Sequence, residues 1–544
     1  MTDGTSAPAY RCGNLAYTRR GLVALFAWLL WGDFCFTLME AVVPSVLPLK
    51  LRGLESANWL IALVMTTLPG VFNTTVCPWV SFRSDRHRGR LGRRIPFILA
   101  TLPFLTASLV LLAFGDEIGR WLHATCLSHG AVRRASVIVL LLAVFAACFD
   151  LFNMFVNSVY WYLFNDVVPP AFLGRFMGWF RAVGTLSNAL YHYFILQYAQ
   201  THMRAIFLGA AALYFVGFGI MCLRVRERDY PPPDDAGLAP SLPRFVRTLA
   251  RECYGNRFYW DIFLATMFTA IGGTIGTFTM FFQFSLGLDL RVIGRLGAVG
   301  LLASAAAMLG AGVLVDRWHP VRTAAYGTAV GAFLAFNNWI WLLTEIPGPW
   351  YYFWVVVAVL PCTALHGALV TTAALPREMM LFPRDRLGQF CGAQSVVRSG
   401  GVMIGGFLAG VFIDLMRQVF PDGDFAYRFN FVWSGCFLLV AFGFHYRAYR
   451  AWKRLGAAEG YRPPAGKCRL EDLPPRRDTA GVRPGLAAVC SLAFVGAAAA
   501  AAVYGLHYWR AGNLPFARLF GLQVGLQAAL CTGYFAFLRF MERP

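Results

Sequence analysis

The sequence predicts an all-α polytopic membrane protein. Of its 544 residues, 58% are hydrophobic and only 14% are charged, whereas soluble globular proteins carry about 25% charged residues. Apolar runs of about 20 residues, long enough to cross a bilayer as a helix, recur along the whole chain. Because backbone polar groups in lipid must be satisfied within the spanning segment, we expect these runs to be helices.

The apolar runs form two sets of six and a final pair. The first set covers approximately residues 21–47, 58–80, 95–114, 135–163, 171–200 and 204–224. The second covers approximately 259–284, 290–314, 321–344, 350–375, 387–416 and 427–449, and the pair covers 484–508 and 514–538. After the first set, "RVRERDYPPPDDAGLAP" combines charges with a proline run that stops a helix.

These boundaries divide the chain into six predicted segments. They are a cytoplasmic tail (1–20), an N-terminal six-helix bundle (21–224), a cytoplasmic linker (225–258), a C-terminal six-helix bundle (259–449), a second cytoplasmic linker (450–483) and a two-helix extension (484–544). No small-residue cleavage site follows a short apolar region, so we expect the first helix to be an uncleaved span.

The basic residues predict the orientation of the chain. The formal net charge is +20, and Lys and Arg gather in alternate short loops, as the positive-inside rule expects of cytoplasmic loops. The loop 115–134 is an exception, because it carries Arg120, Arg133 and Arg134 beside Asp116 and Glu117. We therefore expect a multi-pass cell-membrane protein with both termini in the cytoplasm. No basic stripe stands clear of the spans to bind nucleic acid.

The sequence gives no sign of a metal, a disulfide framework or another cofactor. The 13 cysteines are scattered, mostly within apolar runs, and none forms a C-x-x-C pair. "GGTIGT" at 272–277 resembles a nucleotide-binding loop, but it lacks a lysine and follows no strand. Transport driven by ATP is therefore not expected.

The two sets of six spans repeat each other. "LGRFMG" (173–178) follows the fourth span and "LGQFCG" (387–392) follows the tenth. "SFRSDR" (81–86) follows the second span and "GVLVDR" (312–317) follows the eighth. Two related six-helix halves are typical of secondary transporters, whose substrate site lies between the halves near the membrane midplane.

The loop "SDRHRGRLGRRIPFIL" (84–99) carries a family resemblance. Asp85, Arg86, a glycine at 89 or 92, Arg93 and Arg94 resemble the G-x-x-x-D-R-x-G-R-R signature of the major facilitator superfamily, with Ser81 in place of its first glycine. Residues 312–317 repeat the start of this pattern in the second half. "SDR" followed by "GRRIPFI" is loosely similar to sucrose–proton and glycoside–cation symporters. The resemblance implies a major facilitator fold over residues 20–450.

The resemblance also implies a cytoplasmic gate. In that fold Asp85 would face the N-terminus of the eleventh helix, where free N–H groups and the helix dipole favour a carboxylate. Arg90, Arg93 or Arg94 could pair with Asp166, which ends the fourth span. The residues predicted for this gate are Asp85, Arg86, Arg90, Arg93, Arg94, Asp166, Gly312, Asp316 and Arg317. The alternative is that the arginines only fix the topology.

Three carboxylates inside the N-terminal spans are candidates for cation coupling, because ionisable groups in a membrane are costly and usually functional. Asp33 and Glu40 lie seven residues apart and so share a helix face. Asp150 shares a face with Asn153 and Asn157. The alternative is that these carboxylates only hydrogen-bond a neighbouring helix. The sucrose symporters place a basic residue in the fourth span, and none occurs between 137 and 165.

Polar and aromatic side chains within the spans are candidates for binding the solute. They are Asn153, Asn157, Trp161, Asn188, His192, Gln283, His366, Gln394 and Arg398. A neutral polyhydroxyl solute suits the amides, with Trp161 or Trp339 as a stacking face, whereas an anionic solute suits Arg398. A structural role is the alternative for His192, and contact with lipid is the alternative for Trp339.

These patterns predict a secondary active transporter that moves a small polar solute by alternating access. The resemblance favours a sugar or glycoside and symport with a proton, or else with sodium. A drug or metabolite efflux antiporter and a non-transporting sensor are the alternatives. A membrane enzyme would need a nucleophile or acid–base constellation near a membrane face, and the sequence offers none. The expected partners are the solute, the coupling ion and the lipid bilayer, and the expected state is a monomer.

Overall fold

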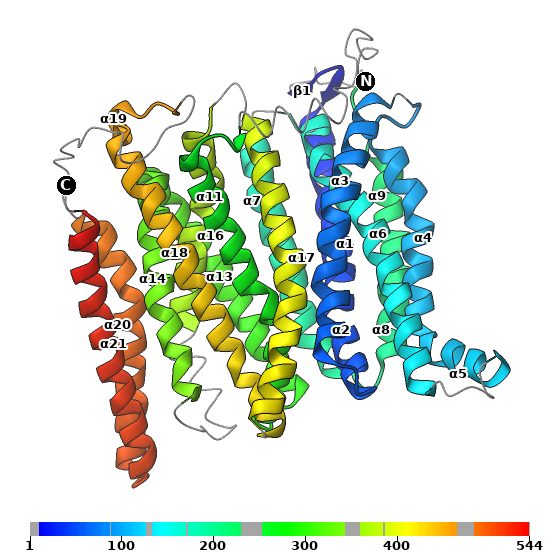
Figure 1. The fold of residues 1–544 in the computed structure, drawn as a ribbon. Coiled ribbons are helices and arrows are strands. Elements are labelled where there is room, and N and C mark those ends of the chain that lie inside the picture. Colours follow the sequence, from blue (N-terminus) through cyan, green and yellow to red (C-terminus); the bar gives the residue numbers. More distant parts are fainter. Residues whose placement is uncertain are drawn as a thin grey trace, which may run out of the picture. The chain divides into compact units, whose positions relative to one another are not determined.

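Helices make up almost the whole of the structure (Figure 1). The computed structural model describes residues 10–87, 89–126, 133–169, 172–229, 253–342, 360–383, 387–420, 422–464 and 483–542. The chain packs as two units. Unit 1 comprises Met1–Gly237, Asp289–Ala298 and Gly406–Asp414, and unit 2 comprises Leu238–Leu288, Val299–Gly405 and Leu415–Pro544.

Unit 1 consists of a small hairpin and a bundle of long helices. In chain order its elements are β1 (Tyr10–Cys12), β2 (Leu15–Tyr17), α1 (Arg19–Gly53), α2 (Asn58–Ala62), η1 (Leu63–Thr67), α3 (Leu68–Arg86), α4 (Ile95–Ala113), α5 (Gly115–Cys126), α6 (Arg134–Val167), α7 (Leu173–Leu190), η3 (Tyr191–Ile195), η4 (Leu196–Tyr198), α8 (Met203–Leu213), η5 (Tyr214–Phe218) and α9 (Gly219–Arg224). The α2–η1–α3 and α8–η5–α9 runs are continuous helices with a π-helical turn inside.

Unit 2 holds the remaining helices, but the first part of α13 and the Gly406–Asp414 stretch of α17 belong to unit 1. Its elements are α11 (Arg257–Thr274), η7 (Ile275–Phe278), α12 (Thr279–Ser285), α13 (Leu290–Trp318), α14 (Pro320–Asn338), η8 (Trp339–Leu342), α16 (Leu360–Leu381), α17 (Leu387–Val419), η11 (Gly423–Phe429), α18 (Asn430–Arg454), α19 (Ala457–Gly460), α20 (Pro484–Arg510) and α21 (Leu514–Met541).

The predicted fold class is confirmed. Each predicted span coincides with a helix or with consecutive helices, and in the described parts of the chain 11 of them are long and apolar enough to cross a membrane. The helices α7, α14 and α16 occupy the three other predicted positions. The start of the predicted span 350–375 lies outside the described residues, as do large parts of both predicted linkers. The division into tail, bundles and linkers stays a prediction.

Several helices continue beyond the predicted spans. The α3 helix ends at Arg86, α6 at Val167 and α18 at Arg454, whereas hydropathy places the span ends at 80, 163 and 449. Hydropathy detects only the part of a helix that lies in hydrocarbon, and backbone hydrogen bonding continues into the polar headgroup layer. These polar extensions carry Asp166 and Lys453, which are discussed below.

The tail before the first span contains a hairpin that the sequence analysis missed. Strands β1 and β2 pair antiparallel, with Tyr10 opposite Tyr17. The Cys12 thiol and the Tyr17 hydroxyl donate to the backbone carbonyls of Asp166 and Val167, at 3.6 and 3.1 Å. The hairpin is therefore attached to the end of α6. Residues 1–9 lie outside the described range.

The core of unit 2 extends into the C-terminal helix pair. Helices α20 and α21 pack on each other, and both also contact α14 (Figure 1). Phe494 of α20 and Tyr534 of α21 are buried in the same apolar cluster as Tyr326, Phe390 and Trp452. This pair, which the sequence predicts as an extension, thus shares a hydrophobic core with the helices before it.

Candidate transport site

Carboxylates and amides from two helices meet inside unit 1. The Glu40 side chain in α1 accepts hydrogen bonds from the Asn153 and Asn157 amides of α6, at 3.3 and 3.0 Å. This geometry follows from the i, i+4 spacing of the two asparagines, which places both on one face of α6. The structure thus brings together one residue predicted for cation coupling and two predicted for solute binding.

Two aspartates lie buried beside this group. Asp33 is 3% exposed and Asp150 is 8% exposed. Both feel the charge of Glu40, and Asp33 also interacts electrostatically with Arg181 of α7. The Thr37 hydroxyl donates to one Asp33 oxygen at 3.4 Å. The second oxygen of each aspartate accepts no hydrogen bond from any residue that the structure describes.

Close packing of α7 against α1 encloses Asp33. A Cβ on Gly184 would lie 3.1 Å from an Asp33 carboxylate oxygen. One helical turn further on, the Ser187 hydroxyl donates to the Phe34 carbonyl at 2.9 Å. Gly184 therefore lets the two helices approach, and a larger side chain there would press on the carboxylate.

Asn188 lies in the last turn of α7 and His192 in the following turn, η3, next to the start of α13. The Asn188 side-chain oxygen and His192 Nδ1 are buried and have no hydrogen-bond partner among the described residues. The His192 backbone carbonyl and imidazole pack on Gly294 and Gly297 of α13, where a Cβ would lie 2.2 and 3.1 Å away. The helices thus meet through glycines, and His192 forms part of this contact.

Arginines and carboxylates cluster where α6 ends. The Arg93 guanidinium binds Asp166 through two hydrogen bonds of 2.8 and 2.7 Å, and Arg94 Nε donates to the same carboxylate at 2.8 Å. Asp166 and Arg94 are almost fully buried. The partner expected from the sequence is therefore in place, although the gating role remains a prediction. Arg90 is exposed at the turn before them.

A second carboxylate, Glu227, caps α4 in the same cluster. Its oxygens accept from the backbone N–H groups of Arg93, Arg94 and Ile95, at 2.9, 2.9 and 2.6 Å. Burial raises the pKa of Glu227, these three hydrogen bonds oppose the rise, and the nearby charge of Asp166 adds to it. Sequence analysis missed this residue, although an acid flanked by arginines directly after the sixth span is a recognisable signal.

The remaining residues of the predicted gate are less defined. Asp85, Arg86 and Asp316 lie on described helices, but their side chains are outside the described part, as are residues 384–386 before α17. Gly312 lies within α13, and a Cβ there would meet no atom within 4 Å. Arg317 is exposed, with its guanidinium 5.9 Å from the Trp318 ring centre.

In unit 2, Gln394 joins a buried polar network rather than standing alone. Its amide donates to Glu378 Oε1 at 2.8 Å and to the Thr266 hydroxyl at 3.0 Å. Arg377, which is 5% exposed, lies 3.5 Å from the same Glu378 oxygen and 3.4 Å from His445 Nδ1. Sequence analysis missed Arg377 and Glu378 because the hydropathy boundary at 375 placed them outside the tenth span.

The other residues predicted for solute binding in unit 2 do not gather around Gln394. His366 Nδ1 contacts the Gly327 carbonyl of α14 at 2.7 Å, so this histidine joins two helices. Gln283 is half-buried in α12, and Arg398 is exposed on α17. The Trp339 indole donates to the Phe431 carbonyl at 2.9 Å. The Trp161 side chain lies outside the described part.

Asp414 is a further residue that the sequence analysis missed. Its carboxylate accepts from the Asn58 backbone N–H, the Asn58 amide and the Trp59 N–H, at 3.2, 2.8 and 3.0 Å. It therefore caps α2, as a carboxylate does at a helix N-terminus. Gly410, one turn earlier, lies so close that a Cβ would be 2.6 Å from the Asn58 carbonyl.

No metal site accompanies these clusters: in the described parts of the chain, no three His, Cys, Asp or Glu side chains lie close enough to hold a metal ion. The carboxylates described above have amide, hydroxyl or guanidinium groups as their hydrogen-bond partners. Such groups can bind a polar solute or exchange a proton, and their hydrogen bonds offer no preorganised nucleophile.

Comparisons with solved structures show the fold. The chain is similar to a bacterial homologue of the human lysosomal transporter Spinster, inward-facing and unoccupied, with 15% identity, 80% of this chain and 98% of that chain covered, and a TM-score of 0.57. A mutant of the nucleoside transporter NupG gives 12% identity, 78% and 99% coverage and a TM-score of 0.57. A D-xylose–proton symporter gives 12% identity, 78% and 97% coverage and a TM-score of 0.50.

The sequence itself carries the family evidence. A comparison with curated proteins gives no match. The family model for the Major Facilitator Superfamily matches residues 29–406, which include the loop signature at 84–99 and its repeat at 312–317. Helices, repeats and loop signature thus agree, and the chain belongs to the major facilitator superfamily as a multi-pass membrane transporter rather than an enzyme.

Proposed function

We propose that this transporter moves a small polar solute, with a sugar or glycoside favoured, by proton-coupled symport into the cytoplasm. The observation that carries the proposal is the group formed by buried Asp33, buried Asp150 and half-buried Glu40 in unit 1, with the Asn153 and Asn157 amides on Glu40. Intramembrane carboxylates of carriers face a cavity or a partner and serve in proton relays.

The hydrogen-bond partners of the three carboxylates suggest which of them exchanges a proton and which contacts the solute. Glu40 already accepts two amide hydrogen bonds, so a solute hydroxyl that replaces them would find both a carboxylate acceptor and amide donors. Asp33 and Asp150 each keep one buried oxygen that accepts no hydrogen bond from a described residue. A proton on such an oxygen removes an unpaired charge from the membrane interior. We therefore assign proton exchange to the aspartates and solute contact to Glu40.

The test is uptake of a panel of labelled sugars and glycosides into proteoliposomes with an imposed pH or sodium gradient. The variants are Asp33→Asn, Asp150→Asn and Glu40→Gln, and the control is Asp424→Asn, an exposed aspartate that lies 3.6 Å from Arg417. We expect either aspartate variant to lower gradient-driven uptake by about tenfold or more, one factor of ten for each 1.4 kcal/mol of lost coupling. The control should transport normally.

The same experiment separates the alternatives. Coupling at the aspartates is wrong if both variants accumulate solute against the gradient as the unsubstituted protein does. Release of preloaded solute driven by an inward proton gradient would identify an efflux antiporter. A protein that is folded in the liposomes but moves no solute in either direction would favour a sensor. A sodium gradient that drives uptake where a pH gradient does not would replace the proton with sodium.

A further inference from the structure

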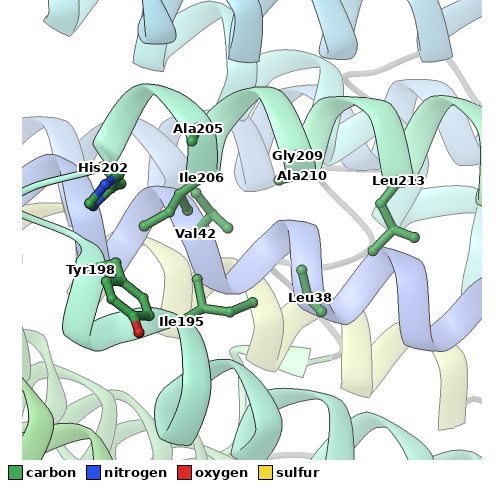
Figure 2. A pocket seen from close by; sticks show the side chains of 10 residues that line it. All are labelled: Leu38, Val42, Ile195, Tyr198, His202, Ala205, Ile206, Gly209, Ala210 and Leu213. Carbon is green, nitrogen blue, oxygen red and sulfur yellow. The ribbon is translucent and has the colours of Figure 1, made fainter.

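Unit 1 has an apolar groove that the transport site does not use (Figure 2). It has a volume of about 510 Å³ and lies between α1, the η3–η4 turn and α8. Leu38 and Val42 form one wall, and Ile195, Ile206 and Leu213 contribute to the others. Figure 2 shows their side chains converging on the space between the two helices, with Tyr198 and His202 at one end.

The groove opens to the surroundings of the bundle. Ala205 and Gly209 are exposed on α8, and a Cβ on Gly209 would meet no atom within 4 Å. Both α1 and α8 belong to candidate membrane spans, so the groove lies at the depth of lipid tails. Water is disfavoured against such apolar walls, and an acyl chain fills them with dispersion contacts.

A polar pocket follows the groove along the same two helices. It has a volume of about 520 Å³, and its walls include Val46 and Lys50 of α1, one and two turns after Val42, and Arg204 of α8. Lys50 forms an ion pair with Asp116, and Arg204 with Glu117. The second oxygens of Asp116 and Glu117 are buried and have no hydrogen-bond partner in the described structure.

The helix that supplies these carboxylates lies across the end of unit 1. Figure 1 shows α5 running roughly crosswise to α4 and α6, at the end opposite the N-terminal hairpin. Its sequence "GDEIGRWLHATC" is strongly amphipathic, and Trp121 is 64% exposed. An amphipathic helix with an exposed tryptophan is typical of the membrane interface, where headgroups lie.

We propose that the groove and the pocket together hold one phospholipid with an ammonium-bearing zwitterionic headgroup. One acyl chain lies between α1 and α8. The phosphate faces Lys50 and Arg204, and the ammonium group faces the unpartnered oxygens of Asp116 and Glu117. The alternation of two cations and two anions in the pocket matches the charges of such a headgroup, whereas an anionic headgroup would add negative charge beside the two carboxylates and bring no cation to balance it.

The test uses the full-length chain in detergent with phosphatidylethanolamine that carries a photoreactive diazirine in one acyl chain. We expect crosslinks to peptides that contain Leu38–Val42 and Ala205–Leu213. Gly209→Trp should fill the groove and reduce this labelling about tenfold, the loss expected when the burial of two CH₂ groups is prevented. The control is Gly525→Trp, because Gly525 is also an exposed helical glycine with open space around its Cβ.

Competition experiments show which headgroup the pocket prefers and whether the acyl chain is needed for binding. Unlabelled phosphatidylethanolamine should compete for the site, phosphatidylglycerol should compete far less, and the double variant Asp116→Asn with Glu117→Gln should remove this difference. Free phosphoethanolamine that competes as well as the lipid would overturn the role of the groove.

Labelling that Gly209→Trp and Gly525→Trp reduce equally would also contradict the proposal. Ala205→Trp serves as a second variant if Gly209→Trp does not fold, and the crosslinked peptides of the unsubstituted chain are informative without any variant.

Discussion

His319 is a residue whose protonation should affect the stability of unit 2. It lies between α13 and α14 with φ of +75°, its Nδ1 accepts a hydrogen bond from the Val321 N–H at 3.3 Å, and its ring lies 5.0 Å from the Trp452 ring. Only an unprotonated Nδ1 can accept this bond. Burial lowers the pKa of His319 from 6.5 to about 4, and the charge of Arg322 contributes to the shift.

The sign of the pH effect follows from this shift. Between pH 6.5 and about 4 the unfolded chain binds a proton at His319 and the folded chain does not. Acidification through this window therefore favours unfolding, by about 1–2 kcal/mol after allowance for partial solvent screening. His319→Asn keeps a side-chain acceptor and tolerates a positive φ. In thermal unfolding from pH 7 to 4.5 this variant should lose less stability than the unsubstituted chain, and equal losses would contradict the prediction.

At the scale of elements, the start of α4 depends on Gly92 and Glu227 together. Gly92 has φ of +100°, and a Cβ there would lie 2.6 Å from Glu227 Cδ. Glu227→Ala removes the acceptor for three N–H groups, so we expect a loss of about 1–3 kcal/mol. Gly92→Ala should be costly as well, because it strains the backbone and displaces the cap.

A double-mutant cycle tests this coupling. Once Glu227 is truncated to alanine, the added methyl group of Gly92→Ala no longer meets Cδ and Oε1, and only its 2.7 Å approach to the Cβ of residue 227 is left. The combined loss should therefore be smaller than the sum of the two single losses. Thermal unfolding in detergent gives the three differences. Strict additivity would contradict the coupling between Gly92 and the Glu227 carboxyl group.

The positions of the helices were easier to predict from sequence than the side-chain contacts between them. Membrane spans must be apolar, so hydropathy locates α1 or α20 without knowledge of neighbouring helices. The pairing of Arg93 and Arg94 with Asp166 could be inferred because the loop resembles a family signature. The arginines around Glu227 mark it as unusual, but its capping role and that of Asp414 could not be inferred. A cap depends on which helix end lies within reach of the carboxylate, and this is decided by long-range packing.

At the scale of the molecule, the same limit applies to the C-terminal pair. Its two spans are evident from the apolar runs. The sequence does not indicate that, besides the shared apolar core, a buried acid just after the last helix links the pair to α14 and α18. Glu542 accepts hydrogen bonds from the Tyr326 and Tyr449 hydroxyls at 2.8 and 2.6 Å, and from Lys453 Nζ at 3.0 Å. All four side chains are buried. No sequence periodicity indicates such a contact over more than 80 positions.

The ion pair between Glu542 and Lys453 predicts how variants at these two positions change the stability of unit 2. Glu542→Gln leaves Lys453 as a buried charge without a counter-ion, so we expect a loss of about 3–5 kcal/mol. Lys453→Met alone leaves the carboxylate unpaired and should also destabilise unit 2. The double variant removes both charges and keeps the apolar packing of Phe494 and Tyr534, so it should recover most of the stability. Thermal unfolding in detergent would measure these differences, and protease cleavage within α20 and α21 would report detachment of the pair. A double variant no more stable than Glu542→Gln alone would contradict the prediction, because the two variants share the amide at 542 and differ only in whether Lys453 stays as a buried charge.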